Sequence, residues 1–175
     1  WVAHDETPGA MRAAETYLAV AIIGGMVMLM GLFLLWHELG TLTISELYAA
    51  AAACPNKGVI WAASICILFG FGAKAGMFPL HIWLPKAHPV APAPASAVLS
   101  GVITKAGVLA VLRVIYYLVG ADVLRGTWVQ KGFMTLTLIT VFMGSMLAYR
   151  ETLLKKRLAY STVSQVSYVL FGLAC

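Results

Sequence analysis

Two lysines lie inside long apolar stretches of this sequence. Lys74 is the only charged residue of a run that begins at Gly58, and Lys105 lies within a second run that begins at Val90. A lysine at the centre of a membrane-spanning helix costs about 2.5–3.5 kcal/mol on insertion scales. Because burial generally favours the neutral form of a lysine, such a side chain can take up and release protons. The pair predicts a proton-transfer path, unless the long side chains reach the interface instead.

A proline-rich joint separates the two lysine-bearing runs and contains two histidines. Pro79 removes a backbone donor from the first run and is predicted to break or kink the helix there. Broken helices at membrane depth line cavities in transporters. His81 follows Lys74 by seven residues, which places both on one face of an unbroken helix. His81 is therefore either a proton carrier or a hydrogen-bonding residue at the interface, whereas for His88 we favour hydrogen bonding.

Small hydroxyl side chains accompany Lys105. Ser96, Ser100 and Thr104 follow one another at four-residue spacing, which places them on one helix face beside that lysine. We expect this face to line water, the alternative being close packing of small residues between helices. The last apolar segment has a second polar face at helical spacing, made of Ser161, Ser164, Gln165 and Tyr168. For this second face, packing against another helix explains the polar residues at least as well as contact with water does.

The elements that position these residues are predicted to be membrane-spanning helices. The chain is 61% hydrophobic and 11% charged, with a mean hydropathy of +0.88, whereas soluble domains are about 25% charged. Segments that face lipid must satisfy their own backbone hydrogen bonds, and the alternating polarity of barrel strands is missing. We therefore predict an all-α, polytopic transmembrane helix bundle with one broken helix. The predicted spans are residues 17–36, 58–84, 90–119, 132–149 and 158–175.

The first span has a recognisable beginning and several small residues. Thr7 followed by Pro8 is typical of a helix N-terminus, so a short surface helix is expected to lead into the membrane. Within the span, Gly24, Gly25 and Gly31 suit close packing against another helix.

The charges exclude some functions and suggest an orientation. A net charge of +5 does not indicate nucleic-acid binding, because the basic residues lie at helix ends or inside apolar runs. The three cysteines lack metal-ligand spacing, and neither a metal site nor a cofactor is predicted. All seven acidic residues lie at or beyond the ends of the apolar runs. The basic segment 150–157 is expected to be cytoplasmic, which places residues 1–16 and the proline joint on the same side.

The motif KAGMFPLHIWLPKAHPVAPAPASAVLSGVITKAGVLAVLR resembles the core of the antiporter-like membrane subunits. These occur in respiratory complex I, membrane-bound hydrogenases, formate hydrogenlyases and multisubunit cation/proton antiporters. The segments VAHDETPGAMRAAETYL and LLKKRLAYSTVSQVSYVLFGL are similar as well, so the resemblance covers essentially residues 1–175. It implies about fourteen spans in two inverted five-helix repeats, each with a broken helix. This chain would then be an internal piece with helices six to nine and the start of helix ten.

The resemblance also implies roles for single residues. Lys74 matches the lysine of the first broken helix, which in the family pairs with a glutamate on helix five, before Trp1. Lys105 matches the lysine on helix eight that links the half-channel to the central hydrophilic axis, although some members carry a histidine near there instead. His81 matches the histidine of the PLHxWLP motif. Lys86 stands where the family commonly has an acidic residue, which alters the charge at the cytoplasmic mouth or marks a subgroup.

These observations lead to three functional hypotheses. The leading one is a proton-translocating subunit of a redox-driven complex in a bacterial or archaeal cell membrane, similar to NADH:quinone oxidoreductase or to a membrane hydrogenase. It would bind no redox cofactor and no nucleic acid, and its partners would be other membrane subunits, the lipid bilayer and protons or Na⁺. The alternative is a subunit of a multisubunit monovalent cation/proton antiporter. A third is a structural helix bundle that conducts nothing.

Overall fold

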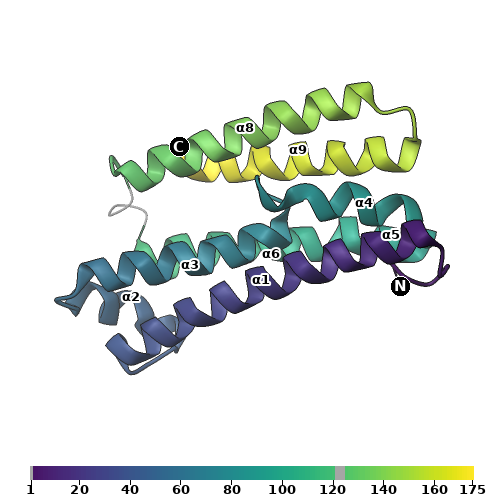
Figure 1. Cartoon of the computed structure of the whole chain (residues 1–175). Coiled ribbons are helices and arrows are strands. Elements are labelled where there is room, and N and C mark those ends of the chain that lie inside the picture. The colour runs from purple at the N-terminus through teal and green to yellow at the C-terminus, as the bar shows by residue number, and fades with distance from the viewer. Residues whose placement is uncertain (1, 121–124) are drawn as a thin grey trace.

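The computed structural model describes residues 2–120 and 125–175, and in these ranges every regular element is a helix (Figure 1). The longer helices are α1 (Pro8–Leu39), α2 (Ile44–Ala53), α3 (Lys57–Ala75), α4 (Trp83–Val90), α5 (Ala93–Val98), α6 (Thr104–Val114), α8 (Trp128–Arg150) and α9 (Leu154–Ala174). Three short helices connect them, namely η1 (Leu80–Ile82), η2 (Leu99–Ile103) and η3 (Ile115–Val119). The all-α prediction is confirmed. Asp122, one of the acidic residues expected beyond the helix ends, lies outside the described residues.

Four segments are long and apolar enough to cross a membrane. They are Pro8–Leu39, Lys57–Val90, Ala93–Val119 and Trp128–Arg150, and they correspond to the first four predicted spans. Large apolar side chains project outward from α1, including Met26, Phe33 and Trp36, as expected of a helix that faces lipid. The fifth predicted span coincides with α9, and its crossing of the membrane stays a prediction.

Helix α1 begins as the sequence predicts but has no separate surface helix. The Thr7 side chain accepts a hydrogen bond from the Ala10 amide at 3.2 Å, and Pro8 is the first helical residue. The helix then continues without a break to Leu39, because no proline lies within it after that position. Gly24 and Gly31 lie against α3, where a Cβ on Gly24 would be 2.8 Å from the Ala73 Cβ.

The broken helix is confirmed, but the break begins before Pro79. Helix α3 ends at Ala75, and the next residue, Gly76, adopts the left-handed conformation with a φ of 78°. Glycine adopts this conformation at helix C-termini without steric cost, and the helix therefore ends at Ala75, four residues before the proline. The chain regains helical structure in η1, and α4 begins at Trp83.

The helices form an elongated bundle, with α4 and α5 at one end and α2 at the other (Figure 1). Helix α1 packs along α3, α3 packs on α6, α8 pairs with α9, and α4 contacts both α1 and α9. At one end, the Lys155 amine donates to the Ala91 carbonyl at 3.4 Å, which connects the start of α9 to the proline joint. Nearby, a hydrogen bond to Glu151 raises the pKa of Lys156. Helix α2 and η3 lie together at the other end.

Candidate functional site

Lys74 lies in the last turn of α3, beside two aromatic side chains. Its Nζ is 5.5 Å from the centroid of the Tyr17 ring on α1. The Trp83 ring from α4 contacts Tyr17 edge-on, with 5.0 Å between the centroids. Trp83 is itself fixed, because its indole nitrogen donates to the Ala73 carbonyl at 2.9 Å and its side chain is buried. A cation over an aromatic face is attracted by the ring quadrupole. Three elements therefore hold the partly buried Lys74.

No carboxylate completes this site within residues 2–120 and 125–175. The two ion pairs in that part of the chain join His37 to Glu38 and Lys156 to Glu151. Lys74 has the Tyr17 ring as its partner instead. The expectation that an acidic partner of Lys74 precedes Trp1 stays a prediction.

His81 lies after the break, so the spacing expected for an unbroken helix does not apply. The ring of His81 is buried and stacks on Phe78, with 5.8 Å between the centroids. Its Nδ1 has no hydrogen-bond partner among the described residues. The Phe78 amide donates to the Thr140 hydroxyl at 3.1 Å, which connects the broken segment to α8. Because α3 ends at Ala75, the backbone turns between Lys74 and His81 and the two do not share a helix face.

His88 has the hydrogen-bonding role that the sequence favours, but in a buried position. Its Nδ1 lies 2.5 Å from the Ser96 hydroxyl. This contact joins α4 to α5 across the proline joint, and the His88 side chain is 4% exposed. Ser96 therefore binds His88 instead of lining water beside Lys105.

Lys105 is exposed in this chain, contrary to the burial expected from its depth in the apolar run. Its Nζ donates to the Ser100 carbonyl at 2.6 Å. Both residues line a groove of about 760 Å³ between α6 and α9, whose polar members also include Ser161, Thr162 and Gln165. The Ser100 and Thr162 hydroxyls are 3.2 Å apart across this groove. Two of the predicted polar residues of the last segment, Ser161 and Gln165, thus line the same groove as Lys105.

The predicted stripe of Ser96, Ser100 and Thr104 is divided by a π-helix. Residues Leu99–Ile103 form this wider turn, in which each amide bonds five residues back, and four-residue spacing no longer keeps one face. Ser100 faces the groove, whereas Thr104 is fully buried and donates to the Ser100 carbonyl at 2.9 Å. Ser100 is therefore the one member of the predicted stripe that lines the groove beside Lys105.

The two lysine-bearing helices are in direct backbone contact. Gly107, two residues after Lys105, packs so closely on α3 that a Cβ there would lie 2.7 Å from the Ala75 nitrogen and 3.1 Å from the Lys74 carbonyl carbon. The hydrogen bonds of the described residues do not join Lys74, His81 and Lys105 to one another. The structure thus brings the two helices together and leaves the three side chains in separate surroundings.

Sequence reasoning missed the aromatic partners of Lys74 and the contribution of Thr162. Trp83 could have been found, because it follows Lys74 in the same broken span. Tyr17 and Thr162 come from other helices, and a single sequence has no signal for such pairings. Among the described residues, no group of three or more histidine, cysteine, aspartate or glutamate side chains could hold a metal ion.

Comparison with known proteins places this chain in a family. Residues 3–175 match the family described as "NADH:quinone oxidoreductase/Mrp antiporter, TM". The chain is 34% identical to hydrogenase-4 component B of Escherichia coli strain K12 over 93% of this chain and 24% of the relative. It is 35% identical to NADH-quinone oxidoreductase subunit N of Pelobacter propionicus over 94% of this chain and 34% of the relative.

A solved structure agrees with these relatives. The Mrp complex from Dietzia sp. contains a chain that superposes with a TM-score of 0.84 at 28% identity, covering 96% of this chain and 30% of the other. This chain spans about a quarter to a third of the length of these proteins. The match over nearly all of its residues shows that the chain belongs to the NADH:quinone oxidoreductase/Mrp antiporter transmembrane family.

Proposed function

We propose that this chain is the proton-translocating part of a membrane subunit in a redox-driven complex. Two relatives above 30% identity, hydrogenase-4 component B and NADH-quinone oxidoreductase subunit N, are named for redox complexes. The observation that carries the proposal is the contact at Gly107. It joins α3, which has the partly buried Lys74, to α6, which has the exposed Lys105. Ionisable residues at membrane depth mark proton relays in pumps and transporters.

The two lysines have complementary parts in the proposed mechanism. Lys105 exchanges protons with water in the groove that Ser100, Ser161 and Gln165 line. Lys74 holds a proton in its enclosed site beside Tyr17. Waters near His81 carry the proton between them, and charge or conformational changes in partner subunits drive the transfer. The chain itself needs no redox cofactor for these steps.

The test uses vesicles that contain the whole complex with the full-length subunit. Lys74→Ala and Lys105→Ala are each expected to abolish proton pumping while the complex still assembles. Lys131→Ala is the matched control, because Lys131 is an exposed lysine of α8 that lines neither the Lys74 cavity nor the Lys105 groove. Pumping that persists in both lysine variants would support the structural-bundle hypothesis and overturn the proposal.

A membrane subunit of a cation/proton antiporter is the second candidate, favoured by the superposition on the Mrp complex. It is also supported by 26% identity to a Na(+)/H(+) antiporter protein of Alkalihalophilus pseudofirmus. Ionophores identify which ion either candidate moves. A gradient that still forms when a protonophore short-circuits protons, but collapses with a Na⁺ ionophore, identifies Na⁺ as the pumped ion. Neighbouring genes for hydrogenase or quinone-reductase subunits favour the redox complex.

The proposed orientation places segment 150–157 in the cytoplasm of a bacterial or archaeal cell. It is supported by the basic residues of that segment and by the Lys155 bond to Ala91, which puts the proline joint at the same end. A cysteine at the exposed Lys86 is expected to react with membrane-impermeant thiol reagents only in inside-out vesicles. Labelling in right-side-out vesicles would reverse the orientation.

A further inference from the structure

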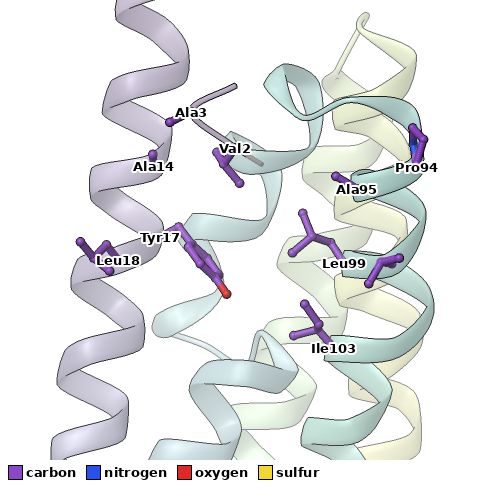
Figure 2. A pocket seen from close by; sticks show the side chains of 10 residues that line it. Val2, Ala3, Ala14, Tyr17, Leu18, Pro94, Ala95, Leu99 and Ile103 are labelled. Carbon is purple, nitrogen blue, oxygen red and sulfur yellow. The ribbon is translucent and has the colours of Figure 1, made fainter. Parts of the chain in front are cut away.

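An apolar pocket of about 530 Å³ opens between the start of α1 and the α5–η2 segment. Figure 2 shows Ala14, Tyr17 and Leu18 on the α1 side and Ala95 and Leu99 on the opposite side. The Tyr17 ring extends from α1 into the space between these helices (Figure 2). This pocket lies at the same end of the bundle as the proline joint, because α5 directly follows that joint.

Tyr17 also lines a second, much smaller cavity, which contains Lys74. That cavity has a volume of about 10 Å³, and its other walls include Gly70, Ala73 and Trp83. The volume is at the lower limit for a single water molecule. The Tyr17 ring is thus a wall shared by the large pocket and the Lys74 site, and neither Leu18 nor Ala14 lines the small cavity.

The Tyr17 ring is fixed from the side of Lys74. The Lys74 amine lies 5.5 Å from the ring centroid, and the Trp83 ring meets Tyr17 at an interplanar angle of 61°. Trp83 is held by its hydrogen bond to the carbonyl of Ala73, the residue that precedes Lys74. One set of contacts therefore positions both the lysine and the ring that covers it.

We propose that Tyr17 is a positioning residue that holds Lys74 and closes it off from the pocket, an inference that rests on the proposed function of Lys74. Apolar constrictions control access in channels because water leaves them, and an aromatic ring between an apolar pocket and a lysine fits this role. A proton reaches Lys74 from the pocket when the Tyr17 ring moves aside. With the ring in place, the cation and the ring attract each other and the site stays closed.

The test measures passive proton flux into vesicles that contain the whole complex, after an imposed pH step and without the driving reaction. Tyr17→Ala is expected to raise this flux several-fold, because it removes the shared wall. Tyr17→Phe keeps the ring and is expected to behave as the wild type in flux and in pumping. Leu18→Ala is the matched control, since it enlarges the same pocket without uncovering Lys74.

A double variant separates a gate from general loosening of the packing. Adding Lys74→Ala to Tyr17→Ala is expected to return the flux to the wild-type level, because the leak passes through Lys74. Wild-type flux in Tyr17→Ala, or an equal leak in Leu18→Ala, overturns the inference. If Tyr17→Ala does not assemble, Tyr17→Leu replaces it with an intermediate leak expected, and wild-type flux there overturns the inference too. Full pumping in Lys74→Ala alone would instead overturn the proposed function.

Discussion

Lys74 and Lys105 are the same residue type on two helices in backbone contact, yet their surroundings are opposite. Lys74 is partly buried, with the rings of Tyr17 and Trp83 beside it and no room for water beyond a cavity of about 10 Å³. Lys105 is exposed beside a groove of about 760 Å³, with a backbone carbonyl as its hydrogen-bond partner. The difference comes from the neighbouring helices, since α1 and α4 cover the first lysine whereas α9 faces the second.

This contrast shows that packing gives two identical side chains different access to solvent. A lysine beside an open groove is accessible to water, whereas a lysine under an aromatic ring is shielded from it. The attraction between a cation and a ring is worth about 0.5–1 kcal/mol when exposed and about 2 kcal/mol or more when desolvated. The enclosed position of Lys74 therefore strengthens the attraction between its charge and the Tyr17 ring.

The largest expected effect comes from removing Trp83, the ring that packs against Tyr17 beside Lys74. Trp83→Ala deletes a side chain that is 1% exposed and leaves the Ala73 carbonyl without its indole donor. Large-to-small changes of buried Trp or Phe cost about 3–5 kcal/mol. We expect the purified complex to have a lower thermal-unfolding midpoint. We also expect the Lys74 side chain to become as exposed to solvent as that of Lys105.

Trp128→Ala is the matched control for this variant. Trp128 is 77% exposed at the start of α8, so its loss is expected to leave the unfolding midpoint nearly unchanged. Equal destabilisation by the two tryptophan variants would show that Trp83 does not hold the Lys74 site together.

The next effect concerns Gly107, whose contact with α3 joins the helix of Lys105 to the helix of Lys74. Gly107→Ala places a Cβ 2.7 Å from the Ala75 nitrogen, a separation that backbone atoms cannot relieve without a helix shift. Overpacking of this kind costs about 1–3 kcal/mol. Gly101→Ala is the control, because nothing lies within 4 Å of its Cβ position. We expect Gly107→Ala to uncouple pumping from the driving reaction, and coupling at the wild-type ratio would contradict a role for this contact.

Much of the fold follows from local sequence patterns. Apolar runs about as long as a membrane is thick predict the spans, and Thr7 and Pro8 predict where α1 begins. The broken helix was also predictable from Pro79, although Gly76 ends α3 first. These features depend on residues close to one another in the sequence, which is why they can be predicted.

The surroundings of the lysines could not be predicted, because they depend on which helices pack together. Tyr17 is far from Lys74 in the sequence, and Thr162 is far from Ser100. The π-helix at Leu99–Ile103 is a further obstacle, since it changes which residues share a face without a proline or any other local signal. Both lysines were found by type and depth, whereas the enclosure of one and the exposure of the other follow from the packing of distant helices.

The smallest expected effect tests the backbone beside Lys105. Thr104→Val keeps the shape of a fully buried side chain but removes the hydroxyl that donates to the Ser100 carbonyl, which leaves Lys105 as the remaining side-chain donor there. A hydrogen bond of this type contributes about 0.5–1.5 kcal/mol. Thr135→Val removes the same kind of bond, to the Lys131 carbonyl, on an exposed face of α8 and serves as the control. In Thr104→Val, the Lys105 amine no longer shares the Ser100 carbonyl with another side-chain donor. We therefore expect Thr104→Val to slow pumping slightly and Thr135→Val to leave the rate unchanged. Equal pumping rates in the two variants would show that the hydroxyl of Thr104 stabilises its helix without affecting the open lysine.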